Sequence, residues 1–108
     1  MIKVEVKAFN LTIDEVSIKG HAMYDDYGKD IVCASVSSIV TTIINCIMNI
    51  DSNSCTYEDD GKIIRIEKIN ENEIVDIILN TMMELFKDLE SNYSKNIKIE
   101  SEEWKCYF

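Results

Sequence analysis

The stretch from Ile31 to Ile50, IVCASVSSIVTTIINCIMNI, constrains the fold of this chain more than any other segment. Its apolar residues recur every three or four positions, which is the spacing of one face of a helix. No Gly or Pro interrupts it, so one long helix is favoured over a pair of buried strands. Many of its apolar residues are β-branched, which lowers helix propensity, so this helix must be stabilised by packing.

Polar residues within the same stretch argue against a membrane span. A spanning helix needs about 18 to 20 predominantly apolar residues, and Ser, Thr and Asn interrupt this stretch. The interruptions are Ser35, Ser37, Ser38, Thr41, Thr42, Asn45 and Asn49. The N-terminal IKVEVK alternates apolar and charged residues, which is not typical of a signal peptide. We therefore expect a cytoplasmic protein with no membrane attachment.

Alternating apolar and charged residues predict two strands before this helix. Residues 2–8 and 15–20 each show the period of two that a half-buried strand requires. Leu11 and Ile13 lie on the opposite parity to the second of these strands. A turn or bulge near Asp14 would absorb the shift.

The second half of the chain repeats the same order of elements. Asp60-Gly61 suits a tight turn between strands at Cys55–Glu58 and Lys62–Lys68. Apolar residues at helical spacing predict a second helix over about residues 73–91, and Ile97 and Ile99 mark a last short strand.

The resulting order, β-β-α-β-β-α-β, predicts an α+β fold in which two helices pack on a mostly antiparallel sheet. With 108 residues, we expect a single domain that spans 1–108. The net charge of −9 argues against nucleic-acid binding and suits a cationic partner, although solubility alone is an equal explanation.

Four cysteines bear on the chemistry: Cys33, Cys46, Cys55 and Cys106. No two lie within four residues of each other, so no zinc-type pair exists, and we expect no metal, no other cofactor and no disulfide framework. We expect Cys46, deep in the long helix among isoleucines, to be inert core. Neither Cys55 nor Cys106 has a helix N-terminus to activate it.

Cys33 has a different setting. If Asp30 caps the long helix, Cys33 lies in its first turn, where free N–H groups and the helix dipole favour a thiolate. His21, the only histidine, ends a strand shortly before, and the intervening loop could bring the two side chains together as nucleophile and general acid/base. First-turn N–H groups could also stabilise an oxyanion. The alternative is an ordinary turn that leads into a buried helix.

Ser37 lies one helical turn after Cys33 and therefore on the same helix face. It could form a hydrogen bond near the site. A serine that bonds back to its own helix carbonyl, with no role in chemistry, is an equally good interpretation.

The segment from Gly20 to Ser37 resembles the ribosomal-processing cysteine protease family, Prp. The resemblance is carried by identities at fixed spacing, GHA followed by G-x-D-I-V-C-A-x-V-S. The matching residues are Gly20, His21, Ala22, Gly28, Asp30, Ile31, Val32, Cys33, Ala34, Val36 and Ser37. The order of elements and the chain length also agree with the family.

This resemblance implies a function. Family members are small bacterial homodimers that remove the N-terminal extension of a large-subunit ribosomal protein, at a short motif rich in phenylalanine. The family nucleophile falls on Cys33 and its histidine on His21, which makes a dyad. The loop from Met23 to Lys29 would move as substrate enters, and its Tyr24 and Tyr27 would contact substrate or simply pack on the loop.

Several alternatives stay open at this point. Gly20, Asp30 and Ser37 are assigned as supporting or substrate-binding residues. Asp30 has three interpretations, as helix cap, partner of His21 or substrate contact, and its position before the helix favours the cap. Two other functions compete with proteolysis: a non-enzymatic acidic adaptor that binds a basic ribosomal protein, and a redox-sensing thiol protein that uses Cys33.

Overall fold

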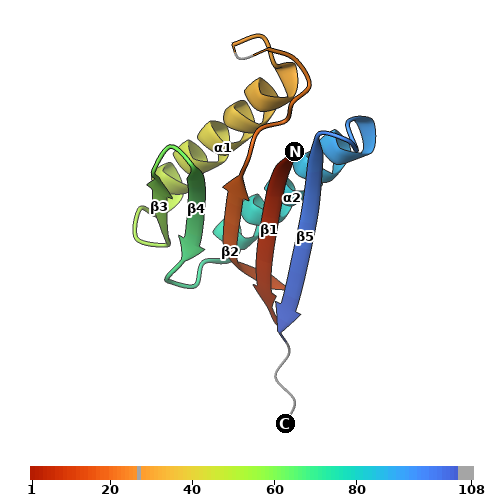
Figure 1. Cartoon of the computed structure of the whole chain (residues 1–108). Coiled ribbons are helices and arrows are strands. Elements are labelled where there is room, and N and C mark those ends of the chain that lie inside the picture. The colour runs from red at the N-terminus through yellow and green to blue at the C-terminus, as the bar shows by residue number, and fades with distance from the viewer. Residues whose placement is uncertain (27, 105–108) are drawn as a thin grey trace.

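The computed structural model describes residues 1–26 and 28–104, which form one sheet and two helices. In chain order the elements are β1 (Ile2–Phe9), β2 (Thr12–Lys19), α1 (Ile31–Ile50), β3 (Cys55–Asp59), β4 (Ile63–Lys68), α2 (Glu73–Asn92) and β5 (Ile97–Trp104). Both helices lie on the same side of the sheet (Figure 1). The order β-β-α-β-β-α-β is therefore as predicted.

The sheet has the strand order β3-β4-β2-β1-β5. The pairs β1–β2, β2–β4 and β3–β4 are antiparallel, and β1–β5 is parallel. The predicted α+β class with a mostly antiparallel sheet is confirmed. Ile2, Val4 and Val6 point into the core under the helices, whereas Lys3 and Lys7, at alternating positions of the same strand, are exposed on the open face.

The predicted irregularity at Asp14 is a β-bulge. Lys7 pairs with Glu15 and the next residue, Ala8, pairs with Ile13, so the ladder skips Asp14. The extra residue restores the parity of the strand and allows both Ile13 and Val16 to be buried.

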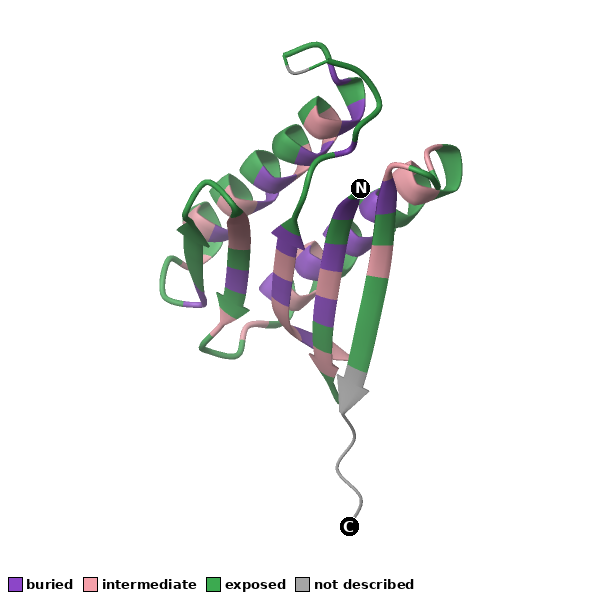
Figure 2. Cartoon of the chain, in the orientation of Figure 1, coloured by how far each residue is buried: buried purple, intermediate pink, exposed green. Residues whose placement is uncertain are grey.

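Helix α1 begins at Ile31 and presents one face to the core. Its buried residues are Val32, Val36, Val40, Ile43 and Ile47. Figure 2 shows these buried positions on the side of the helix that faces the sheet, with exposed positions outside. Packing on the sheet therefore supplies the stabilisation that its β-branched composition demands.

The polar interruptions do not by themselves take this helix out of the length and composition range of membrane spans. With 20 residues and a mean hydropathy of 2.0, α1 is long and apolar enough to cross a membrane by length and composition. A helix that packs on the core of a globular protein can have the same length and hydropathy, and the buried residues of α1 do belong to the hydrophobic core.

Cys46 is exposed, so the prediction that it lies in the core is also wrong. It shares the outer side of α1 with Thr42, Asn45 and Asn49, which are spaced three, four and seven residues apart. The isoleucines next to it in the sequence, Ile43 and Ile47, point the opposite way into the core. The neighbouring isoleucines suggested that Cys46 is buried, whereas its helical spacing with Thr42, Asn45 and Asn49 indicates that it is exposed.

The last strand is longer than predicted. Ile97 and Ile99 are followed by polar residues, but β5 continues to Trp104 because each of its residues pairs in register with β1. The ladder of a neighbouring strand, rather than local hydrophobicity, sets its length.

Candidate active site

The start of α1 borders a cleft of about 860 Å³. Gly20 and His21, from the end of β2, line it together with Asp30, Cys33 and Ser37 from the beginning of α1. Asp59, Gly61 and Lys62 from the β3–β4 turn also line it, as does Ile2 from the start of β1. The fold thus brings both residues of the expected dyad, with three expected supporting residues, to one cleft.

Asp30 is the N-cap of α1, and both of its carboxylate oxygens are engaged. Oδ1 accepts hydrogen bonds from the backbone N–H groups of Val32 (3.0 Å) and Cys33 (3.1 Å). Oδ2 accepts from the N–H groups of Tyr24 (2.9 Å) and Asp25 (3.2 Å). Burial alone would raise the pKa of Asp30, but these four hydrogen bonds outweigh it and hold the pKa below its usual value. The cap interpretation is confirmed, and the same carboxylate also holds the loop.

This cap changes what the first turn can offer a substrate. The N–H groups of Val32 and Cys33 already donate to Asp30, and that of Ala34 donates to the Asp30 carbonyl at 3.0 Å. The expectation that these first-turn groups are free to stabilise an oxyanion is therefore wrong for all three.

The sulfur of Cys33 contacts the strand end that carries His21. The backbone N–H of Ala22 donates to Cys33 Sγ at 3.4 Å. His21 is exposed and Cys33 is half-buried, so both are accessible from the cleft.

Gly20 takes a backbone conformation that favours glycine, with φ of +90°. A Cβ atom at this position would collide with the carbonyl oxygen of Met1. The absence of a side chain therefore lets the end of β2 pass close to the chain's first residue, directly before His21.

Ser37 lies on the same side of α1 as Cys33, one turn further along, and lines the same cleft. Tyr24 does not line it; its ring packs edge-to-face on Tyr93, with ring centroids 5.3 Å apart. Tyr27, the other tyrosine expected to contact substrate, lies outside the described residues.

The remaining cysteines have no such surroundings. Cys55 is buried at the start of β3, and burial raises the pKa of its thiol. Cys46 lies on the outer side of α1, away from the residues that line the cleft. Cys106 lies outside the described residues. Among residues 1–26 and 28–104, no group of three His, Cys, Asp or Glu side chains is placed to hold a metal ion.

One residue near the site has no signal in the sequence. The side-chain amide of Asn96, in the turn between α2 and β5, donates to the carbonyl of Ala22 at 2.8 Å. The two residues lie 74 positions apart, so no local pattern could have paired them.

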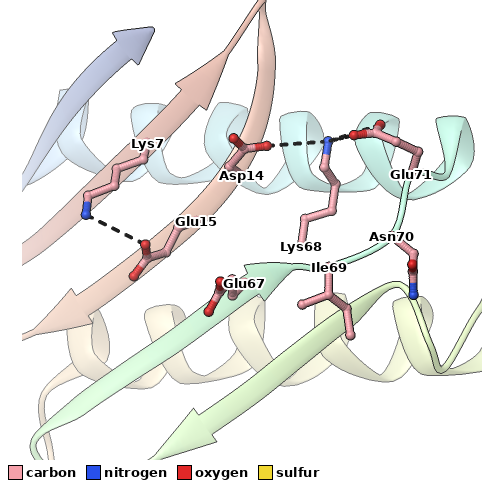
Figure 3. A pocket seen from close by; sticks show the side chains of 8 residues that line it. All are labelled: Lys7, Asp14, Glu15, Glu67, Lys68, Ile69, Asn70 and Glu71. Atoms are coloured by element: carbon pink, nitrogen blue, oxygen red, sulfur yellow. Dashed lines mark hydrogen bonds and ion pairs between the residues drawn. The ribbon is translucent and has the colours of Figure 1, made fainter.

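A second hollow, of about 590 Å³, lies at the far end of β4 and holds no His or Cys (Figure 3). Its centre is Lys68, whose side chain is only 3% exposed and whose Nζ lies 3.7 Å from Asp14, 3.3 Å from Glu71 and 3.2 Å from Asp76. Burial opposes the charge on Lys68, but hydrogen bonds to Asp76 and Glu71 outweigh it and raise its pKa. We interpret this cluster as a structural ion-pair network that fastens the bulge at Asp14 to α2.

Comparison with known proteins points to one protein family. The family model described as cysteine protease Prp matches residues 1–98. A ribosomal processing cysteine protease Prp of Staphylococcus aureus is 31% identical over 90 residues, which cover 81% of this chain and 85% of the relative.

Solved structures show the same architecture. A crystal structure of an essential ribosomal processing protease Prp from S. aureus, with a covalently linked product peptide, superposes with a TM-score of 0.86 at 29% identity, covering 94% of this chain and 100% of that one. A second structure of that protease, with a substrate peptide, gives a TM-score of 0.83 at 26% identity, with the same coverage. A Streptococcus mutans protein shares the fold, with a TM-score of 0.83 at 22% identity and 95% coverage of each chain.

Proposed function

The chain belongs to the cysteine protease Prp family, and from this premise we propose that it removes the N-terminal extension of a large-subunit ribosomal protein, with Cys33 as nucleophile and His21 as general acid/base. The observation that carries the residue assignment is the meeting of β2 and α1. Cys33 Sγ accepts the N–H of Ala22, the residue next to His21, and both expected catalytic residues line one cleft.

The proposed reaction starts from a Cys33 thiolate and a protonated His21. The thiolate attacks the scissile carbonyl carbon, a C–S bond forms, and the carbonyl oxygen takes the negative charge. Collapse of this adduct breaks the C–N bond, and the leaving amine takes the proton from His21. Neutral His21 then accepts a proton from the water that attacks the thioester, and release of the acid regenerates the thiolate and the protonated imidazole.

Two further observations support a covalent route on a peptide. The S. aureus protease was crystallised with a covalently linked product peptide and, separately, with a substrate peptide. In this chain the cleft beside Cys33 is open to solvent at His21 and Ser37 and is large enough to take several peptide atoms.

The supporting roles follow from the same contacts. Asp30 fixes the first turn of α1 against the loop, and Gly20 permits the close approach of β2 to Met1. Ser37, which is exposed and lies one turn beyond Cys33 on α1, would contact substrate at the cleft.

The proposed setting is a cytoplasmic enzyme whose single domain spans 1–108. The net charge of −9 suits a basic ribosomal protein as substrate and disfavours binding to nucleic acid.

We also propose a homodimer, the commonest assembly for a small chain. Exposed apolar side chains on α2, such as Ile77 and Leu85, are available for an interface. Light scattering at tens of micromolar measures this state, and a monomer mass would contradict it.

The test of the enzyme assignment compares two cysteines of the same helix. Cys33→Ala should abolish cleavage of the extended ribosomal protein, because no other thiol in the described residues lines the cleft. Cys46→Ala, the matched control, should cleave at the wild-type rate because Cys46 is exposed away from the cleft. Product mass reads out the cut. Undiminished cleavage by folded Cys33→Ala would rule the nucleophile out.

A further inference from the structure

Both backbone polar groups of Ala22, the residue after His21, are hydrogen-bonded. The N–H of Ala22 donates to Cys33 Sγ at 3.4 Å, and its carbonyl accepts the side-chain amide of Asn96 at 2.8 Å. Ala22 itself is only 1% exposed, so neither end can exchange its partner for water without opening the structure. Asn96 therefore restrains the residue whose N–H faces Cys33.

Asn96 is itself fixed by the backbone around it. Its N–H donates to the carbonyl of Tyr93 at 2.8 Å, and its carbonyl accepts the N–H of Ile2 at 2.8 Å. The ring of Tyr93 packs against that of Tyr24, two residues beyond Ala22. The turn between α2 and β5 thus contacts the segment from Ala22 to Tyr24 at two points.

We infer that Asn96 is a positioning residue for the proposed reaction: through the Ala22 carbonyl it holds the His21–Ala22 segment so that the Ala22 N–H points at Cys33 and the imidazole stays at the cleft. This inference rests on the proposed function. Asn96 does not line the cleft; it acts through the backbone of Ala22. An amide is required at this point because the partner is a carbonyl, to which a carboxylate cannot donate.

Two substitutions test this role. Asn96→Asp keeps the shape of the side chain but loses the donor, and Asn96→Ala loses it without adding charge. We expect kcat to fall by about ten- to hundredfold in both, because a misplaced reacting group costs rates of this order. KM for the extended ribosomal peptide should change by less than about twofold, because the lost bond does not touch substrate.

Asn70→Asp is the matched control. The Asn70 amide donates to the carbonyl of Asn53 at 2.6 Å on the exposed surface, outside the cleft. The control therefore removes the same kind of bond and adds the same charge elsewhere. It should leave kcat and KM at their wild-type values.

A second readout does not need cleavage. In a Cys46→Ser, Cys106→Ser background, alkylation by iodoacetamide reports chiefly Cys33, since Cys55 is buried. The two Asn96 variants should alkylate several-fold more slowly than the parent, because Cys33 Sγ is no longer held by the N–H of Ala22 beside the cleft.

The outcomes separate the two levels of the account. If Cys33→Ala still cleaves, the assignment of Cys33 as nucleophile fails, and the alkylation rate alone then decides whether Asn96 positions the segment at Cys33. Unchanged kcat together with unchanged alkylation in folded Asn96 variants would overturn the inference. So would a lower melting temperature with full cleavage per folded molecule, or an equal fall of kcat in Asn70→Asp.

Discussion

At the scale of single residues, Asp30 connects folding to the site. One carboxylate oxygen caps α1 through Val32 and Cys33, and the other holds the N–H groups of Tyr24 and Asp25. A helix cap needs only the first pair of contacts. The second pair anchors the loop that joins His21 to Cys33, so loss of the carboxylate should loosen both segments.

The lowered pKa of Asp30 gives this role a pH dependence. A carboxyl whose pKa is lower in the folded than in the unfolded state stabilises the fold above its usual value of 3.8, and that contribution is lost as pH falls through the folded value. Asp30→Asn should therefore unfold at a lower urea concentration than wild type near pH 7. The gap between the two proteins should narrow as the solution is acidified below 3.8.

Asp26→Asn is the control for this experiment, because Asp26 is an exposed acid of the same loop whose carboxyl does not cap the helix. Its unfolding midpoint should follow that of wild type at every pH. A gap between wild type and Asp30→Asn that stays constant from neutral to acid pH would contradict the assignment, because the carboxylate charge would then contribute nothing.

At the scale of elements, the sequence predicts whatever depends on local spacing. The parity change before Val16 locates the bulge at Asp14, and Asp30 with the following apolar spacing locates the start of α1. Each feature depends on residues close to it in the sequence, and the structure has both at the predicted positions.

Elements that depend on a distant partner are predicted less well. The last strand extends to Trp104 because β1 pairs with it, and the sequence after Ile99 carries no apolar signal. The exposure of Cys46, by contrast, could have been predicted from the sequence, since the helical spacing of Thr42, Asn45 and Asn49 indicates an outer face of the helix.

At the scale of the whole molecule, the candidate site is assembled from segments far apart in the chain. The motif from Gly20 to Ser37 suggests His21 and Cys33 as candidates, because a strand end and a helix start lie on either side of one loop. The contributions of Ile2, the β3–β4 turn and Asn96 come from the order of strands in the sheet and from the turn before β5. No spacing rule contains that information.

The fold also explains why one cysteine of α1 is a candidate nucleophile and another is not. Cys46 is more exposed than Cys33, so accessibility alone would favour reaction at Cys46. Cys33 lies in the first turn of α1, receives the N–H of Ala22 and shares a cleft with His21. In the proposed reaction this setting outweighs exposure.

Labelling with a peptide chloromethyl ketone is the sharpest test that Cys33 is the nucleophile. The peptide part of the reagent carries the sequence that precedes the cleavage site, and the residue it alkylates is determined. Peptide mapping by mass spectrometry locates the alkylated residue after one equivalent of reagent. The account predicts a single adduct on Cys33, with Cys46 unmodified in spite of its greater exposure. An adduct on Cys46, or label divided among the cysteines according to their exposure, would contradict it.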